Sequence, residues 1–313
     1  MESIPGNHLL PIPPNAMDNI RKIHNLDKPD RLNEAIDILE NWLIKQDHLL
    51  KKDFDRGYLE RSIISCKGSV EKAKTQIDRL CTMKTLLPQF FLKTNVKKEL
   101  LDVLTVAWLV PLPVLTDDFY RVFVIKLNCK NFTDALFLEY FQYNIILSEY
   151  IKAHDYVNGV MLVFDLQEIN IVDMVTRMNP MMLQQYMSIL IEGYGARMKS
   201  FHFLTSSKTV DLLMKLFKQF LSNKISKRMH VQKTLDDLHK AVPKHLLPEE
   251  YGGKEKSIKK LIDDCIEDLS TDEHVKYMEM MRQAATDEKL RRSAKFNEEY
   301  MGMPGSFRNM SVD

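Results

Sequence analysis

The chain has 313 residues, enough for one large domain and a smaller one. Its 44 basic and 43 acidic residues leave a formal net charge of +1, so no global field steers it to nucleic acid, and any charged partner must meet a local patch. The four cysteines (Cys66, Cys81, Cys129 and Cys265) form no CxxC pair, which is typical of free thiols in a reducing compartment. No run of about 18 apolar residues predicts a membrane-spanning helix.

Residues 1–28 are predicted to form an N-terminal arm. Four prolines between residues 5 and 14 favour an extended chain, because proline lacks the backbone donor that a helix needs. This stretch has neither a basic region nor a long apolar segment, so it does not resemble a signal peptide. We therefore expect a cytoplasmic protein.

Residues 29–92 are predicted to form a small helical domain. Apolar side chains recur at three- and four-residue spacing from Leu32 to Leu43, which places them on one helix face. Two further helices are expected at residues 56–66 and 69–86, separated by Gly68.

Residues 93–255 alternate between short segments that predict strands and longer segments that predict helices. Residues 159–164 carry no polar side chain, as expected for a central strand covered on both faces. The strands are expected at residues 106–110, 121–127, 159–164, 199–204 and 227–231, and the helices at 132–154, 180–193 and 209–221. This alternation predicts an α/β fold with a mainly parallel sheet. Residues 256–313 are expected to form a C-terminal tail that is charged and helical over 257–294.

The usual signatures of catalytic, phosphate-binding and metal sites are absent from the sequence, so no catalytic residue, cofactor or metal is expected. Asp165 ends the central strand, where it is either a general base or an acceptor for backbone N–H groups. His202 lies within a predicted strand and is interpreted as a core imidazole, whereas His230 is expected at the surface.

Residues 209–221 stand out among the helices. Their apolar side chains cover about 200° of arc, more than a helix resting on one side of a core requires. The helix is therefore either buried on two sides or a movable lid over an apolar cavity. Several of the 18 methionines fall nearby, and their flexible thioethers suit an irregular apolar pocket.

Basic residues gather next to the predicted lid. They are Arg197, Lys199, Lys224, Lys227 and Arg228. Such a group is either a solvated face or a patch that meets an anionic membrane surface.

The order of several landmarks resembles the CRAL-TRIO lipid-binding family over residues 30–255. They are the segment 159–166, Asn179-Pro180 opening a helix, the segment 201–203, the basic segment 224–230, and Leu-Pro-Glu-Glu-Tyr-Gly-Gly at 247–253. The sequence Leu-Leu-Pro-Gln-Phe-Phe at 86–91 is similar to arthropod members of the α-tocopherol-transfer-like branch. The resemblance implies one hydrophobic molecule in a cavity with a sheet floor, a helical lid and a preceding all-helical domain.

The resemblance also implies positions for the ligand-binding residues. The long helix would contribute Asn144, Ile145 and Ser148, the floor Val160 and Phe164, the wall Met178, Tyr186, Ile189 and Leu190, and the lid Val210, Leu213, Met214 and Phe217. The family's phosphoinositide-contacting positions fall on Arg197, Lys224 and Arg228, with Lys227 beside them.

Some positions depart from the family pattern. Ile64 and Cys66 replace basic residues in the second helix of the N-terminal module, and Glu168 stands where a glycine is usual. Asn144 replaces a serine of the tocopherol carrier. The identity of the ligand therefore does not transfer from the family.

We predict a non-catalytic, monomeric carrier of a tocopherol, retinoid, carotenoid or other terpenoid, which transfers its ligand at membranes by lid opening. The expected partners are this hydrophobic ligand and, transiently, a membrane surface with phosphoinositides; nucleic acid is not expected. Three alternatives stay open. They are a phosphoinositide-sensing signalling module, a phospholipid transfer protein, and a lipid-modifying enzyme with Asp165 or His202 as base.

Overall fold

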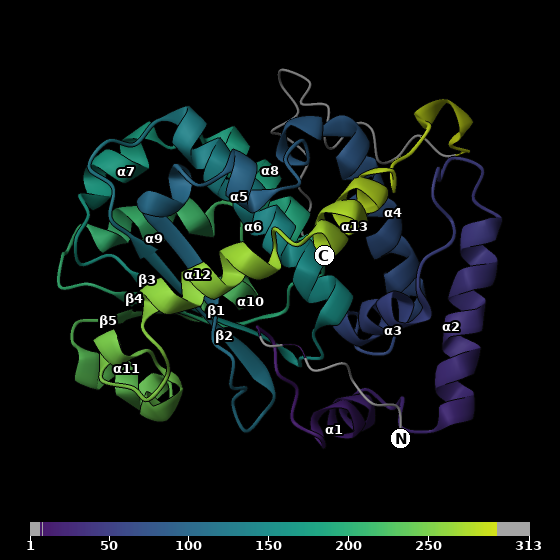
Figure 1. Ribbon diagram of the computed structural model, residues 1–313, viewed down its shortest axis with the longest axis horizontal. Helices are drawn as coiled ribbons and strands as arrows, with labels where there is room; N and C mark the ends of the chain where they lie inside the picture. The colour runs from purple at the N-terminus through teal and green to yellow at the C-terminus, as the bar shows by residue number, and fades with distance from the viewer. Residues whose placement is uncertain (1–6, 8, 293–313) are drawn as a thin grey trace.

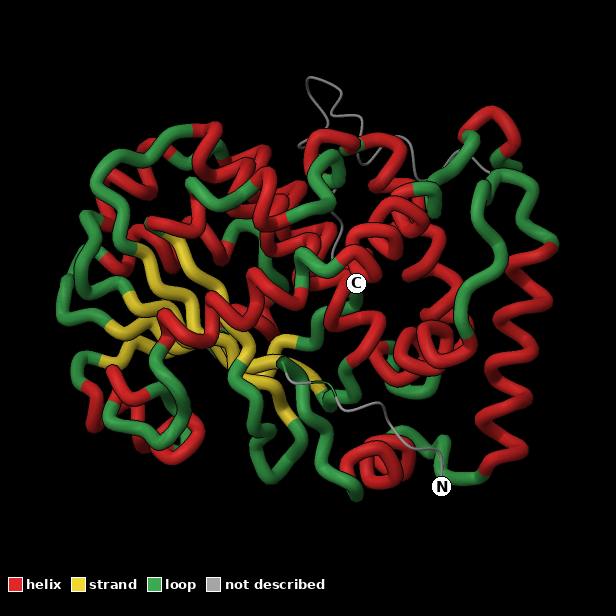
Figure 2. The backbone as a smooth tube through the Cα atoms, in the orientation of Figure 1, coloured by secondary structure: helices red, strands yellow, loops and turns green. Residues whose placement is uncertain are grey.

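The computed structural model describes residue 7 and residues 9–292, and Figures 1 and 2 show its layout. The rest of the predicted arm (1–6 and 8) and of the predicted tail (293–313) lies outside the described residues. The described chain begins with four helices, α1 (Ala16–Ile23), α2 (Pro29–Ile44), α3 (Arg56–Ser65) and α4 (Val70–Leu86). Their apolar faces share one core, so the predicted helical region before the sheet is confirmed. Helix α1 was not predicted, because it lies within residues 1–28, which were expected to form an arm.

A five-stranded sheet follows, in the order β1-β2-β3-β4-β5. β1 pairs antiparallel with β2, and the other neighbours are parallel, as the alternation of strands and helices predicts. The strands are β1 (Ala107–Pro111), β2 (Tyr120–Leu127), β3 (Gly159–Asp165), β4 (Met198–Leu204) and β5 (Met229–Gln232).

The connections between the parallel strands are helical. β2 leads through α6 (Asp134–His154) to β3, and Thr133 caps α6 by accepting the backbone N–H of Leu136. β3 leads to β4 through α7 (Ile171–Arg177), α8 (Pro180–Ser188) and a π-helical turn (Ile189–Gly193). β4 leads to β5 through α9 (Val210–Lys218) and α10 (Asn223–Ser226).

The helix predicted at residues 209–221 is shorter than expected. α9 ends at Lys218, and Ser222 starts a separate turn by accepting the backbone N–H of Ile225. The sequence pattern did not separate the two, because apolar side chains continue through the break as Phe220 and Leu221.

The two faces of the sheet have different covers. Register places Leu109, Ile125, Phe164 and Phe203 in one row across four strands, so their side chains share a face. Helices α6 to α9 lie over that face. The opposite face packs against α11 (Leu235–Ala241), the turns Lys244–Leu246 and Glu249–Tyr251, and the start of α12 (Ile258–Asp268).

The described part of the predicted helical tail forms two helices. α12 ends at Asp268, and Thr271 caps α13 (Asp272–Arg282) by accepting the backbone N–H of His274. The last described element is a turn, Glu288–Leu290, and the remaining short elements are α5 (Val96–Glu99), Pro88–Phe90 and Val103–Thr105.

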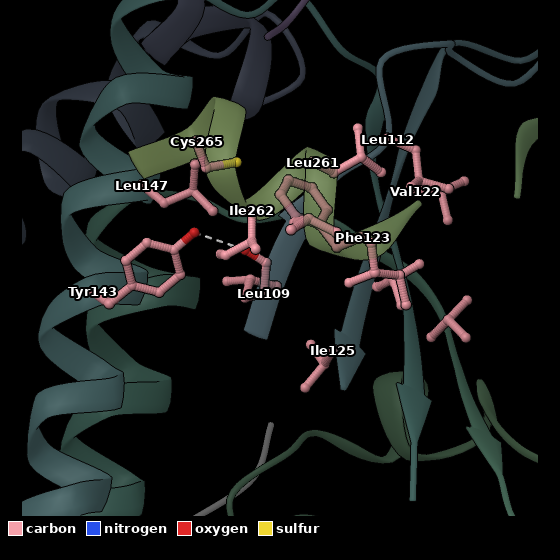
Figure 3. Close-up of a cluster of buried hydrophobic side chains, with 14 of the residues drawn as sticks. Leu109, Leu112, Val122, Phe123, Ile125, Tyr143, Leu147, Leu261, Ile262 and Cys265 are labelled. Carbon is pink, nitrogen blue, oxygen red and sulfur yellow. Dashed lines mark hydrogen bonds between the residues drawn. The ribbon is translucent and has the colours of Figure 1, made fainter. Parts of the chain in front are cut away.

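The tail is part of the core. Figure 3 shows Ile262 and Cys265 of α12 beside Leu109 of β1 and Tyr143 of α6, whose hydroxyl donates to the Leu109 carbonyl at 2.8 Å. α13 runs between the sheet and the N-terminal helices (Figure 1), where the Met281 carbonyl accepts from Lys84 of α4 at 2.8 Å. The tail therefore ties the two halves of the molecule together.

The four cysteines are free thiols, and three of them are buried. Among the helices of residues 7–292, none is long and apolar enough to cross a bilayer.

Candidate functional site

An elongated cavity of about 220 Å³ lies between the sheet and helices α6 to α9. Its floor is the face that carries Leu109, Ile125 and Phe164, and its side walls come from α7, α8 and the π-helical turn. α3 closes one end through Arg61, Ile64 and neighbouring Ser65. Because most of the lining is aliphatic, aromatic or methionine, the site suits an apolar molecule.

Helix α6 runs along the whole cavity. Its lining residues extend from Leu136 to Asp155, a span of about 28 Å at 1.5 Å per residue. Tyr140, Asn144, Ser148 and Lys152 recur there at four-residue spacing, so they form one polar stripe on the cavity side.

Most polar groups of this stripe already form hydrogen bonds within the protein. Tyr186 donates its hydroxyl to Asn144 Oδ1 at 2.9 Å, while Asn144 Nδ2 donates to the Tyr140 carbonyl and Ser148 Oγ to the Asn144 carbonyl. The Tyr140 hydroxyl is buried and has no partner in the part of the chain that the structure describes. Burial raises the pKa of Tyr140 above its usual value, so this hydroxyl stays a donor.

Helix α9 closes the cavity on the side opposite α6. Leu213 and Phe217 face inward, and the Phe217 ring lies 5.9 Å from that of Phe164 and 6.1 Å from that of Phe203. On the outer side Leu212 is 41% exposed. The helix thus has apolar groups on both sides, as the wide apolar arc of the sequence indicates.

Nine of the thirteen predicted ligand-binding residues line the cavity: Asn144, Ser148, Val160, Phe164, Met178, Tyr186, Leu190, Leu213 and Phe217. Three others, Ile145, Ile189 and Val210, are buried in the core cluster around it, and Met214 is partly buried against that cluster. Whether any of them contacts a ligand stays a prediction.

The polar lining at the α3 end of the cavity was not predicted from the sequence. There Arg61, Ser65, Lys152, Asp155 and Arg197 join the lining. The four-residue spacing on α6 was a usable signal for Lys152, since a lysine in the polar stripe of a buried helix faces the same side as Asn144 and Ser148.

A second pocket, of about 560 Å³, opens on the surface beside this end. Of the predicted phosphoinositide-contacting residues, Arg197, Lys224 and Arg228 line it, and Lys227 does not. Lys67, Lys72 and Lys199 also line it and are exposed. Lys67 and Lys72 follow α3, so this region supplies positive charge although Ile64 and Cys66 are not basic.

The charges of the surface pocket repel one another. Arg197, followed by Lys224, lowers the pKa of Lys67. Arg197 donates to His24 Nε2 at 3.0 Å, and burial, with Arg197, lowers the pKa of His24 to about 4, so this imidazole is a neutral acceptor near pH 7. A cluster of positive charges held close together attracts an anion.

The cavity and the surface pocket share a wall. Ser65 and residues 195–198 line both. Gly195 has a φ of +70°, and a Cβ there would lie 1.7 Å from Gln76 Nε2. The wall is therefore one layer of backbone, and only glycine fits at position 195.

The two candidate bases lie away from the cavity. Asp165 faces the other side of the sheet, where it accepts from the Tyr251 hydroxyl at 2.8 Å and from the Gln167 backbone N–H at 3.2 Å. His202 is buried on the same side between Ser200 Oγ at 2.8 Å and Gln232 Nε2 at 3.1 Å, as expected of a core imidazole. His230 is exposed, as predicted.

Among residue 7 and residues 9–292, no group of three or more histidine, cysteine, aspartate or glutamate side chains is arranged to hold an ion.

Comparison with known proteins gives two family matches. The CRAL/TRIO domain matches residues 113–253, and the Pinta-like UBA domain matches residues 28–101. The alpha-tocopherol transfer protein-like proteins of Mus musculus and Homo sapiens are each 23% identical over 235 residues, which cover 72% of this chain and 66% and 67% of those proteins. The predicted placement among arthropod members stays a prediction.

The fold has a counterpart among solved structures. The structure described as "Crystal structure of Sfh5" matches with a TM-score of 0.50 and 15% sequence identity, covering 82% of this chain and 98% of that one. At this identity the match supports the fold alone.

Proposed function

This chain carries a CRAL-TRIO domain and is homologous to alpha-tocopherol transfer protein-like proteins, and we propose that it is a non-catalytic carrier of one small hydrophobic molecule. The observation that carries the proposal is the largely apolar cavity between the sheet and α6 that α9 closes. Tocopherols, retinoids, carotenoids and other terpenoids are the candidate ligands. Each buried methylene contributes about 0.8 kcal/mol, so few polar contacts are needed to orient such a molecule.

Release of the ligand requires an opening, and we assign it to α9. Its inner residues Leu213 and Phe217 cover the cavity, while Leu212 presents an apolar side chain to the exterior. Displacement of this helix at a membrane would expose the cavity to lipid and leave Leu212 in an apolar environment.

Phe217→Asp tests the lid. It places a carboxylate beside Phe164, and the closed state then has to bury an unpaired charge. We expect transfer of a fluorescent terpenoid from the protein to vesicles to be lost. Gln219→Asp is the matched control, because it adds the same charge at an exposed position of the adjoining turn. Transfer at the wild-type rate by Phe217→Asp would refute the lid.

The basic surface pocket favours a second function, binding of phosphoinositide head groups in a membrane. Arg197, Lys224 and Arg228 line it, with further lysines around them. This function accompanies carrier activity or replaces it in a signalling module. Binding to phosphoinositide vesicles through this pocket is expected to fall steeply with ionic strength, whereas ligand binding in the cavity is not.

Native mass spectrometry of the purified protein, followed by extraction and identification of the bound lipid, separates the alternatives. One isoprenoid per chain supports the carrier, and a diacyl phospholipid supports phospholipid transfer. A protein that carries no lipid but binds phosphoinositide vesicles at low salt supports the signalling module. We further propose that the protein acts as a monomer in the cytoplasm and associates peripherally with membranes.

A further inference from the structure

Lys152 is a buried cation in the lining of the cavity. Its ammonium group donates to Gln76 Oε1 at 3.0 Å and to Ser65 Oγ at 3.3 Å, and it lies 5.7 Å from the centre of the Tyr58 ring. Both hydrogen-bond acceptors are neutral. Burial of a charge without an opposite charge is costly, so a buried lysine with only neutral partners calls for an explanation.

The carboxylates of Glu149 on α6 and of Asp155, the residue after α6, are both paired with other groups. Glu149 accepts from Lys84 at 3.2 Å, from Tyr194 at 2.9 Å and from Tyr277 at 3.3 Å. Asp155 accepts from two nitrogens of Arg121, at 2.7 and 2.9 Å, and neither side chain is exposed. Across residues 7–292, Lys152 therefore has no carboxylate within ion-pair distance.

The other charged groups at this end of the cavity add to the positive potential. Arg61 has Asp55 at 3.9 Å, but that carboxylate is 79% exposed. Arg197 contacts the neutral His24 and no carboxylate of the described chain. The charge of Asp155 is balanced by Arg121. The apolar cavity thus ends among three cations, of which Lys152 and Arg197 have no carboxylate partner in the described part of the chain.

We infer that the ligand of this cavity is a single-chain lipid acid whose anionic head group pairs with Lys152 while its hydrocarbon chain follows α6. The inference rests on the proposed carrier function and specifies its cargo. The head group is a carboxylate or a phosphate monoester, since both present oxygens that accept from an ammonium group. A retinoid or terpenoid acid satisfies the same description as a fatty acid.

The shape of the cavity agrees with one chain. The lining follows α6 from Leu136 to Asp155, over about 28 Å, in a volume of only about 220 Å³. From the Lys152 end a chain would run past Ser148 and Asn144 towards Tyr140, which lies about 18 Å away along the helix axis. The aromatic groups at that far end, among them Phe132 and Phe141, suit an apolar terminus.

The ionisation of Lys152 supports this role. Burial lowers its pKa to about 8, while Cys66 and Glu149 oppose the shift and Arg61 adds to it. These groups, with the Tyr58 ring, surround the amine from α3 and α6. The amine is therefore still mostly protonated at pH 7, and an incoming anion would raise its pKa again.

The test compares three lipids that share one oleoyl-length chain: oleate, oleyl alcohol and oleoyl lysophosphatidate. Each is titrated into the delipidated full-length protein against a fluorescent apolar reporter. Wild type is expected to bind oleate at least about tenfold more tightly than oleyl alcohol, the effect of one charge-assisted hydrogen bond. Lys152→Met is expected to abolish this preference and still bind the alcohol, which shows that the cavity is intact.

Two controls separate the charge of Lys152 from other effects. Lys152→Arg keeps a cation at the position and is expected to retain a preference for oleate. Lys93→Met removes one charge from a partly exposed pair with Glu139 outside the cavity and is expected to behave as wild type. An unchanged preference in Lys152→Met, or equal affinities of wild type for oleate and the alcohol, would overturn the inference.

The other possible results identify the anionic group of the lipid. They also distinguish a failure of this inference from a failure of the carrier function. Tighter binding of lysophosphatidate than oleate, lost in Lys152→Met, supports the lipid acid and assigns the anion to a phosphate. Failure of wild type to bind any of the three lipids contradicts the carrier function itself. Binding of the alcohol alone leaves the carrier function standing and refutes the anion.

Discussion

Replacement of Lys152 by methionine also has a consequence for stability that depends on pH. The pKa of this lysine is lowered from 10.5 to about 8, which corresponds to a destabilisation of roughly 3 kcal/mol when both the folded and the unfolded chain are protonated. Methionine removes that charge but also the hydrogen bonds to Ser65 and Gln76, worth about 1 kcal/mol each. The two acceptors keep each other as partners, because Ser65 Oγ lies 3.1 Å from Gln76 Oε1. The ligand-free variant should therefore be more stable than wild type by about 1 kcal/mol at pH 7.

The sign of this difference should change with pH. Between pH 8 and 10.5 the unfolded chain binds more protons at this lysine than the folded one does, so the stability of wild type relative to the variant rises with pH. By about pH 9.5 roughly 2 kcal/mol of the destabilisation has gone, so wild type should then be more stable than Lys152→Met by about 1 kcal/mol. Other groups titrate in the same range, so only the difference between the two proteins is informative.

Urea denaturation of both proteins, ligand-free, at pH 7 and at pH 9.5 measures this difference. A variant that is less stable than wild type by 1 kcal/mol or more at pH 7 would refute the reasoning, since it would mean that the lysine is not penalised by burial. A difference that is the same at both pH values would show that Lys152 does not titrate in the expected range.

Three further predictions concern other parts of the molecule. Arg121→Met leaves the Asp155 carboxylate buried without its partner and should lower the free energy of unfolding by about 3–5 kcal/mol; Asp155→Asn in the same chain should restore part of it, and urea denaturation measures both. Gly195→Ala should lower the melting temperature, because a left-handed φ costs about 1–2 kcal/mol and its Cβ meets Gln76; an unchanged value would contradict the tight wall. Lys224→Ala should weaken binding to phosphoinositide vesicles about fivefold, since one lysine near an anionic surface contributes about 1 kcal/mol, and should reduce its salt dependence in co-sedimentation; binding like wild type would exclude this lysine from the contact.

Much of the sheet could be predicted because its signals are local. β3 has no polar side chain before Asp165, and β2 is rich in β-branched residues, so both strands and their parallel order follow from composition and alternation. The end of α9 was harder to place. Its C-terminal boundary depends on Ser222, which caps the next turn. The apolar residues Phe220 and Leu221 continue the helical pattern beyond Lys218, so the pattern alone does not indicate the boundary.

The polar end of the cavity shows what local pattern cannot reveal. Lys152 on a helix surface would be an ordinary solvated lysine. Its burial depends on the packing of α3 against α6 and on the Gln76 side chain that α4 contributes. Its partners Ser65 and Gln76 lie 87 and 76 residues away in the chain. The burial of Arg121 also depends on a partner distant in the chain, because its pairing with Asp155 joins the start of β2 to the end of α6. The spacing in α6 predicts which face these groups share, but not that the face is enclosed.

The wall formed by Ser65 and residues 195–198 lies between the cavity and the basic pocket, so a shift of this backbone would change both sites. If occupation of the basic pocket shifts this backbone layer and alters the affinity of the cavity by some factor, occupation of the cavity must alter the affinity of the pocket by the same factor. A protein that unloads more readily on a charged membrane would then also leave that membrane more readily when loaded. Through this shared layer of backbone, the loaded and empty forms would then have different residence times on the same bilayer.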